Sequence, residues 1–97
     1  MNSADRASDM TTSQLGELAL RCRRHIVKMI HAAGAGHPGG SLSAIDIIAA
    51  LYGNQLRFDV ENPDWPDRDR FIMSKGHASP AVYSILFEMG FISEDDM

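Results

Sequence analysis

The chain has 97 residues and a formal net charge of −4, which allows one small domain at most and gives no reason to expect nucleic acid as a partner. An apolar share of 44% permits a packed core and argues against general disorder. No apolar run is long enough to predict a membrane span or a signal peptide, and the single cysteine fits a reducing compartment, so we expect a cytoplasmic protein.

The first element that the sequence predicts is a helix over residues 14–33. Its apolar residues recur every three or four positions, as on one buried helix face. Thr11 with Gln14 could form a capping box at its start, or Ser13 could cap it alone. Gly34 stands where helices commonly end. The only cysteine lies on the apolar stripe, and we interpret it as a buried structural thiol.

A second helix is expected over residues 44–56. Ser43 is its expected N-cap, because an acidic residue follows three positions later. Leu42 and Ile47 stand at the two positions of a hydrophobic staple around that cap. The polar segment that follows contains two prolines and is interpreted as a surface connection.

One short strand and a third helix are expected in the C-terminal half. Residues 71–74 read "FIMS", an apolar run bounded by charge and a turn, which predicts a buried strand of the parallel type. Ser79 and Pro80 match an N-cap followed by proline at the first helical position. We therefore expect a helix over residues 80–89, with Gly90 just past its end.

The predicted fold class is α/β, mostly helical with one strand. We expect residues 1–12 to be a flexible lead-in and residues 13–97 to form part of a larger domain. "SEDDM" at residues 93–97 is typical of a helix start, and the chain stops within that turn, so we interpret the chain as a fragment or one piece of a split protein. Such a fragment would leave apolar faces uncovered at Ile45, Ile48, Phe71 and Ile85.

The stretch "GAGHPGG", residues 34–40, fits the dinucleotide-binding pattern G-x-G-x-x-G. That pattern requires a strand before it, whereas a helix is predicted here, so we exclude dinucleotide binding. No Gly-Lys-Ser/Thr follows, which excludes a P-loop. A plain helix–helix connection and a ligand-binding loop remain open. His37, between glycine and proline, would suit hydrogen bonds to substrate hydroxyls.

The stretch "SKGHASP", residues 74–80, follows the predicted strand and leads into a helix. Ligands collect at the carboxyl ends of strands in open α/β sheets, and helix N-termini favour anions such as phosphate. His77 could therefore meet a phosphorylated ligand, although an ordinary turn with an exposed histidine fits as well. His25 and His31 are interpreted as boundary or surface residues of the first helix, and no residue set has zinc-ligand spacing.

Together these stretches resemble the N-terminal region of transketolases. The resemblance runs from about residue 14 to residue 97 and is carried by "GAGHPGGSLSAIDIIAALY" and "NPDWPDRDRFIMSKGHASPAVYSIL". "GGSLS" and "SKGHA" are most similar to the N-terminal subunit of split transketolases. The resemblance implies the N-terminal fragment of a thiamine-diphosphate-binding fold, an enzyme that moves a two-carbon ketol unit from a ketose to an aldose, and sugar phosphates as substrates.

The resemblance also implies roles for four residues. The catalytic candidates are His37 and His77, with His37 binding substrate and His77 near the cofactor diphosphate and the donor sugar. Ser74 and Gly76, which flank the lysine of the second motif, are expected to bind the cofactor with His77. Histidines that hydrogen-bond to hydroxyls and developing oxyanions suit such a reaction.

The chain lacks other parts of the family's site. The glycine-aspartate-glycine motif with its downstream asparagine and the glutamate that activates the cofactor are missing, so Mg²⁺ could be held only by oxygen ligands from elsewhere. We therefore expect the chain alone to be inactive and to require the remaining transketolase sequence or a C-terminal subunit, in a dimeric or heterotetrameric assembly. The alternatives are a related thiamine diphosphate enzyme acting on another or a sulfonated sugar, and an inactive truncated fragment.

Overall fold

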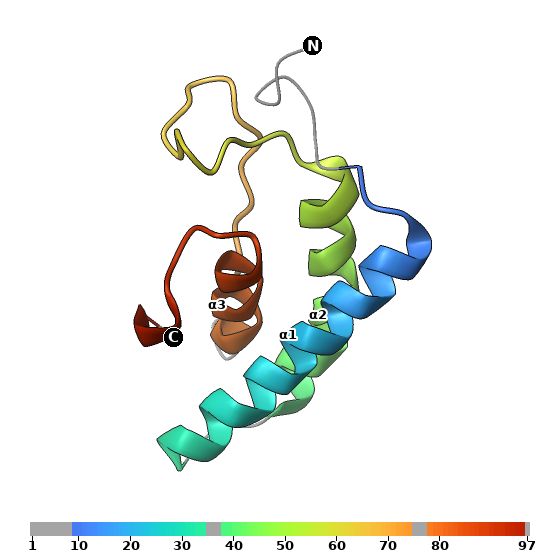
Figure 1. The fold of residues 1–97 in the computed structure, drawn as a ribbon. Coiled ribbons are helices and arrows are strands. Elements are labelled where there is room, and N and C mark those ends of the chain that lie inside the picture. Colours follow the sequence, from blue (N-terminus) through green and yellow to red (C-terminus); the bar gives the residue numbers. More distant parts are fainter. Residues whose placement is uncertain (1–8, 35–37, 75–77, 97) are drawn as a thin grey trace.

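The computed structural model describes residues 9–34, 38–74 and 78–96. Its principal elements are the α-helices α1 (Thr12–Ala33), α2 (Pro38–Ala50) and α3 (Ser79–Glu88). α2 and α3 run in the same general direction and α1 crosses them in the opposite sense, so that each helix packs against the other two (Figure 1). Among the described residues, no helix combines the length and apolar character that a bilayer span requires.

α1 begins with the capping box that the sequence suggested. Gln14 N–H donates to Thr11 Oγ1 at 3.2 Å, and Thr11 N–H donates to the side-chain oxygen of Gln14 at 2.9 Å. These two bonds satisfy backbone donors that a helix start otherwise leaves free. Thr11 is therefore the cap rather than Ser13, and the helix starts two residues earlier than predicted. Gly34 ends the helix in the left-handed region, at φ 70°.

α2 begins at Pro38, six residues before the predicted start. Proline is well suited to a first helical turn, and the two glycines after it continue the helix. Ser43 is therefore inside the helix, where its hydroxyl donates to the carbonyl of Gly40 at 3.0 Å. The predicted cap at Ser43 is wrong, and so is the staple, because the Ile47 side chain is 65% exposed.

α2 continues into a π-helical turn, η2 (Leu51–Gln55), in which Leu56 N–H donates to the carbonyl of Leu51 at 2.7 Å. The lead-in packs closely here, since a Cβ on Gly53 would collide with Leu15 and lie 3.0 Å from the sulfur of Met10. Met10 N–H also donates to the carbonyl of Gly53 at 3.2 Å. Met10 is thus anchored, which differs from the flexible lead-in expected for residues 1–12; residues 1–8 lie outside the described residues.

α3 begins at Ser79, with Ala78 in the N-cap position and no side-chain cap. The predicted cap at Ser79 is therefore wrong by one residue, whereas Pro80 does lie in the first turn. Gly90 follows the helix with φ 92°, as the sequence predicted. Phe91 N–H then donates to the carbonyl of Leu86 at 2.8 Å and closes the end of the helix.

The predicted strand at residues 71–74 does not form in the described part of the chain. Burial along the segment alternates as in a strand: Phe71 and Met73 are half-buried, whereas Ile72 is 83% exposed and Ser74 is exposed. A strand also requires a neighbour to share its backbone hydrogen bonds, and no described residue supplies one. The regular elements of the described residues are helices, so the α/β part of the prediction is not observed in them.

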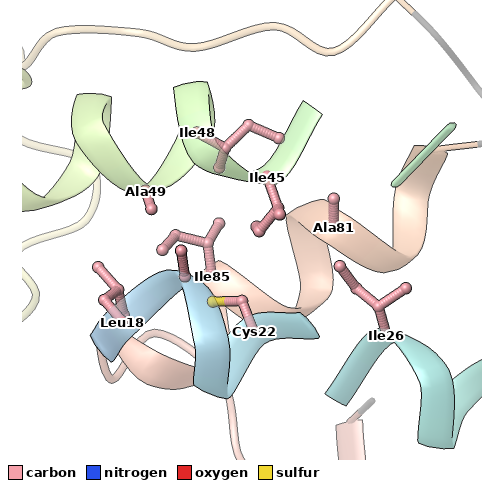
Figure 2. Close-up of a cluster of buried hydrophobic side chains, with 9 residues drawn as sticks. Leu18, Cys22, Ile26, Ile45, Ile48, Ala49, Ala81 and Ile85 are labelled. Atoms are coloured by element: carbon pink, nitrogen blue, oxygen red, sulfur yellow. The ribbon is translucent and has the colours of Figure 1, made fainter. Parts of the chain in front are cut away.

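The three helices share one core of fully or almost fully buried side chains (Figure 2). α1 supplies Leu18, Cys22 and Ile26, and α2 and α3 face them with smaller or β-branched side chains. The full set is Leu18, Ala19, Cys22, Ile26, Ile45, Ile48, Ala49, Ala81 and Ile85. Burial of this apolar surface is the main force that holds α2 and α3 on α1. Ile45, Ile48 and Ile85, which we expected to be uncovered, are buried within the chain itself.

Candidate functional site

The N-termini of α2 and α3 lie at the same end of the helix cluster. In Figure 2, Ile26 of α1 and Ala81 of α3 lie toward one end of the core, while Leu18 of α1 and Ala49 of α2 lie toward the other. The first turns of α2 and α3 therefore lie near each other (Figure 1).

Both histidine motifs lead directly into these two helix starts. Position 37 is followed by Pro38, the first residue of α2, and position 77 is followed by Ala78, the N-cap of α3. His37, Gly76 and His77 themselves lie outside the described residues. The structure thus brings together the two helix starts that follow the motifs, which the sequence separates by about forty residues.

Ser74 is the one predicted site residue that the structure describes. It ends the extended segment that starts at Phe71, and its side chain is exposed. Phe71 and Met73 fix this segment by packing against the core. Ser74 therefore lies, with an exposed side chain, at the end of an anchored segment.

The two helix starts carry little that would compete with an anion. Neither α2 nor α3 has an acidic residue in its first turn, and Ala78 offers no side-chain acceptor to the first amides of α3. Helix N-termini have a partial positive charge and unpaired N–H groups, both of which favour phosphate oxygens. This end of the cluster therefore has the electrostatic character that favours an anion.

Sequence reasoning missed Ser41, which lies in the first turn of α2. Its side chain is fully buried, and its hydroxyl has no hydrogen-bond partner among the residues that the structure describes. Ser41 lies one turn before Ile45, on the face of α2 that points into the core. The predicted second helix began at residue 44, three residues too late to include Ser41. Ser41 was therefore not recognised as a residue on the buried face of this helix.

The described residues do not fit a magnesium site, since no three His, Cys, Asp or Glu side chains among them lie close enough to hold a metal ion. Cys22 is buried, and burial raises the pKa of its thiol to about 11. A thiol with that pKa stays protonated and is a poor nucleophile. Cys22 is therefore a structural residue, as the sequence predicted.

His25 is more than a surface residue, because it joins an ion-pair cluster between α1 and α3. Arg21 Nε donates to one carboxylate oxygen of Glu88 at 2.6 Å, and His25 Nε2 lies 2.7 Å from the other oxygen. Burial acts to raise the pKa of Glu88, but the hydrogen bonds from Arg21 and His25 outweigh it and the pKa is lowered. We refer to these three residues as the Glu88 cluster.

Comparison with known proteins points to one family. The family described as "Transketolase, thiamine diphosphate binding domain" matches residues 16–97. Transketolase-like protein 2 of Bos taurus is 44% identical over 96 residues, which cover 97% of this chain and 15% of that protein. Human transketolase is 35% identical over the whole of this chain, which covers 16% of it.

A subunit of a 6-deoxy-6-sulfo-D-fructose transketolase from Clostridium sp. (strain MSTE9) is 45% identical over 69 residues. That match covers 71% of this chain and 25% of the subunit. The chain thus spans between about a seventh and a quarter of the length of these relatives.

Proposed function

The chain belongs to the transketolase family, in the thiamine-diphosphate-binding domain, and from this premise we propose that it supplies the N-terminal part of a transketolase active site. The reaction is the transfer of a two-carbon ketol unit from a ketose to an aldose. The observation that carries the proposal is the arrangement of α2 and α3, whose first turns lie at one end of the core and directly follow the two histidine motifs.

Each motif residue has a role in this proposal. His77, Ser74 and Gly76 bind the cofactor beside the first turn of α3, where the positive end of the helix dipole favours its diphosphate. His37, beside the first turn of α2, binds substrate hydroxyls and stabilises charge that develops on oxygen. When bound, thiamine diphosphate supplies the nucleophilic carbon that breaks the carbon–carbon bond next to a ketose carbonyl.

The chain does not complete this site alone. The described residues lack a metal-binding group, so we propose that Mg²⁺ is held by residues from the rest of a longer transketolase or from a C-terminal subunit. The segment Phe71–Ser74 fits the same interpretation, because its burial alternates as in a strand and it has no described partner strand. In the complete enzyme, which we propose to be a cytoplasmic dimer or heterotetramer, this segment becomes a strand.

The donor sugar defines the second candidate function. The similarity to a 6-deoxy-6-sulfo-D-fructose transketolase subunit favours a sulfonated ketose as the alternative to a sugar phosphate. Both donors carry an anionic group, and the same ketol transfer serves both. Steady-state assays of the complete enzyme with each donor decide between them, because the preferred donor has the higher kcat/KM.

Replacement of His37 tests the proposed site. In the complete enzyme that contains this chain, we expect His37→Ala to lower kcat/KM for ketol transfer by about 100-fold or more, the usual effect of losing a group that moves or stabilises a proton. His31→Ala is the matched control, since His31 is exposed in the last turn of α1, outside both motifs. Equal activity of the two variants would remove His37 from the site.

A further inference from the structure

The Glu88 cluster joins α1 and α3 through two polar contacts to a single carboxylate. Arg21 and His25 lie one turn apart on α1, and each contacts a different oxygen of the Glu88 carboxylate, at 2.6 and 2.7 Å. Only 13% of the Glu88 side chain is exposed. Phe87 packs edge-on against the His25 ring, with ring centroids 5.0 Å apart, and so limits rotation of the imidazole.

Glu88 occupies an unfavourable place for a carboxylate. It is the last residue of α3, where the helix dipole has its negative end. The two cationic or hydrogen-bonding partners on α1 offset this repulsion and the cost of burial. The side chain is therefore stable in this position only while α3 keeps Glu88 opposite Arg21 and His25.

The fully buried face of α3 contains few large apolar side chains. Its fully buried side chains are Ala81, Ser84 and Ile85, of which only Ile85 is large, while Leu86 is partly buried against the core. Small side chains make shallow ridges, so they interlock weakly with the grooves of a neighbouring helix. Charge-assisted hydrogen bonds are directional, and the two that meet at Glu88 constrain its distance from both Arg21 and His25.

We propose that the Glu88 cluster sets the register of α3 against α1 and thereby places the first turn of α3. A helix of this length is about 15 Å long and moves nearly as a rigid body, so a shift at Glu88 reaches Ser79. The assignment of this first turn to a cofactor site rests on the proposed function. The register of α3 against α1 does not depend on that function. Glu88 is in this sense a positioning residue.

Methyl NMR spectra of the 97-residue chain, without cofactor, test the register. We expect Glu88→Ala to shift the Ala81 and Ile85 methyl signals and to change their nuclear Overhauser contacts with α1. Asp46→Ala is the matched control, because it breaks the exposed Arg23–Asp46 ion pair, 2.7 Å long, between α1 and α2. This control should leave the α3 signals in place.

A merely stabilising role predicts a different result. In that case Glu88→Ala lowers the unfolding midpoint while the native pattern of α3 methyl contacts is unchanged, which overturns the proposal. If Glu88→Ala does not fold, the Glu88→Gln variant decides, since glutamine keeps the size and an acceptor for Arg21 but removes the charge. An unchanged pattern of α3 methyl contacts in Glu88→Gln overturns the proposal. Loss of folding in both variants overturns the proposal as well.

The complete enzyme separates this inference from the proposed function. With the register shifted, we expect Glu88→Ala to raise the half-saturating concentration of thiamine diphosphate about tenfold while kcat at saturation is maintained, which corresponds to about 1.4 kcal/mol of binding. Shifted NMR signals with unchanged cofactor affinity would confirm the register and contradict the location of the cofactor site.

Discussion

Ser41 and Ser84 are both fully buried, but within the described part of the chain only Ser84 has a hydrogen-bond partner. Ser84 Oγ donates to the carbonyl of Ala81 at 2.8 Å, whereas the hydroxyl of Ser41 has no partner among the described residues. A buried hydroxyl without a partner loses its bonds to water and gains none in return. Ser41, in the first turn of α2, is therefore less well suited to the core than Ser84.

Alanine at these two positions should have opposite effects. We expect Ser41→Ala to raise the free energy of unfolding by about 1 kcal/mol, because it removes an unpaired polar group. Ser84→Ala should lower the free energy of unfolding by about the same amount, since it removes a hydrogen bond. Urea denaturation of both variants measures the difference, and a destabilising effect of Ser41→Ala would contradict the unpaired state of its hydroxyl.

Glu88 makes the fold sensitive to acid. Burial would raise the pKa of Glu88, but its bonds to Arg21 and His25 lower it below the unfolded value. A carboxyl of this kind contributes stability above its unfolded pKa, and that stability is lost as the pH falls through the folded pKa. Arg21 and His25 are the groups that act on Glu88, and the nearby Cys22 thiol, with a pKa of about 11, stays neutral.

We therefore expect the free energy of unfolding to fall as the pH is lowered below about 5, the range in which such carboxyls take up protons. Glu88→Gln should make this decline shallower, because it removes one of the titrating groups. Asp46→Asn, which affects an exposed ion pair, should leave the slope unchanged. Equal slopes in Glu88→Gln and the unchanged chain would show that Glu88 does not contribute.

At the scale of elements, the sequence predicted helices well and their starts poorly. The ends at Gly34 and Gly90 were predictable, since glycine at positive φ is the usual helix terminator. The start of α2 was not, because Pro38 and two glycines suggest a turn when read alone. The strand failed for another reason: its alternating burial is present, but its hydrogen-bond partners are not among the described residues.

Two glycines in helical segments should respond oppositely to alanine. At Gly53, in η2, an added Cβ meets Leu15 and Met10, so we expect Gly53→Ala to lower the free energy of unfolding by about 1–3 kcal/mol. At Gly16, in α1, nothing lies within 4 Å of the added atom, and the better helix former should stabilise by about 1 kcal/mol. Thermal denaturation followed by circular dichroism measures both, and stabilisation by Gly53→Ala would contradict the close contact with the lead-in.

At the scale of the whole molecule, the chain has a buried core of its own but exposes large apolar side chains on its outside. The side chains of Ile47 and Ile72 are 65% and 83% exposed, on the outside of α2 and of the segment that resembles a strand. The candidate site was predictable as two motifs, and the closeness of the two helix starts that follow them emerged only from the fold. The metal-binding part could not be found, because no described group of residues fits it.

The isolated chain should therefore bind its proposed cofactor poorly. Two helix N-termini attract a diphosphate weakly in water when no metal ion offsets its charge. We expect titration calorimetry of the 97-residue chain with thiamine diphosphate and Mg²⁺ to show no binding in the micromolar range. Micromolar affinity would mean that the chain holds a complete site.

The affinity of the complete enzyme for thiamine diphosphate tests the central claim most directly. If the motif before α3 binds the cofactor, His77→Ala in the complete enzyme should weaken that affinity by about tenfold or more, equivalent to about 1.4 kcal/mol. His31→Ala, on the exposed end of α1, should leave it unchanged. Equal affinities of the His77→Ala, His31→Ala and unchanged enzymes would contradict the assignment of this end of the helix cluster to the cofactor.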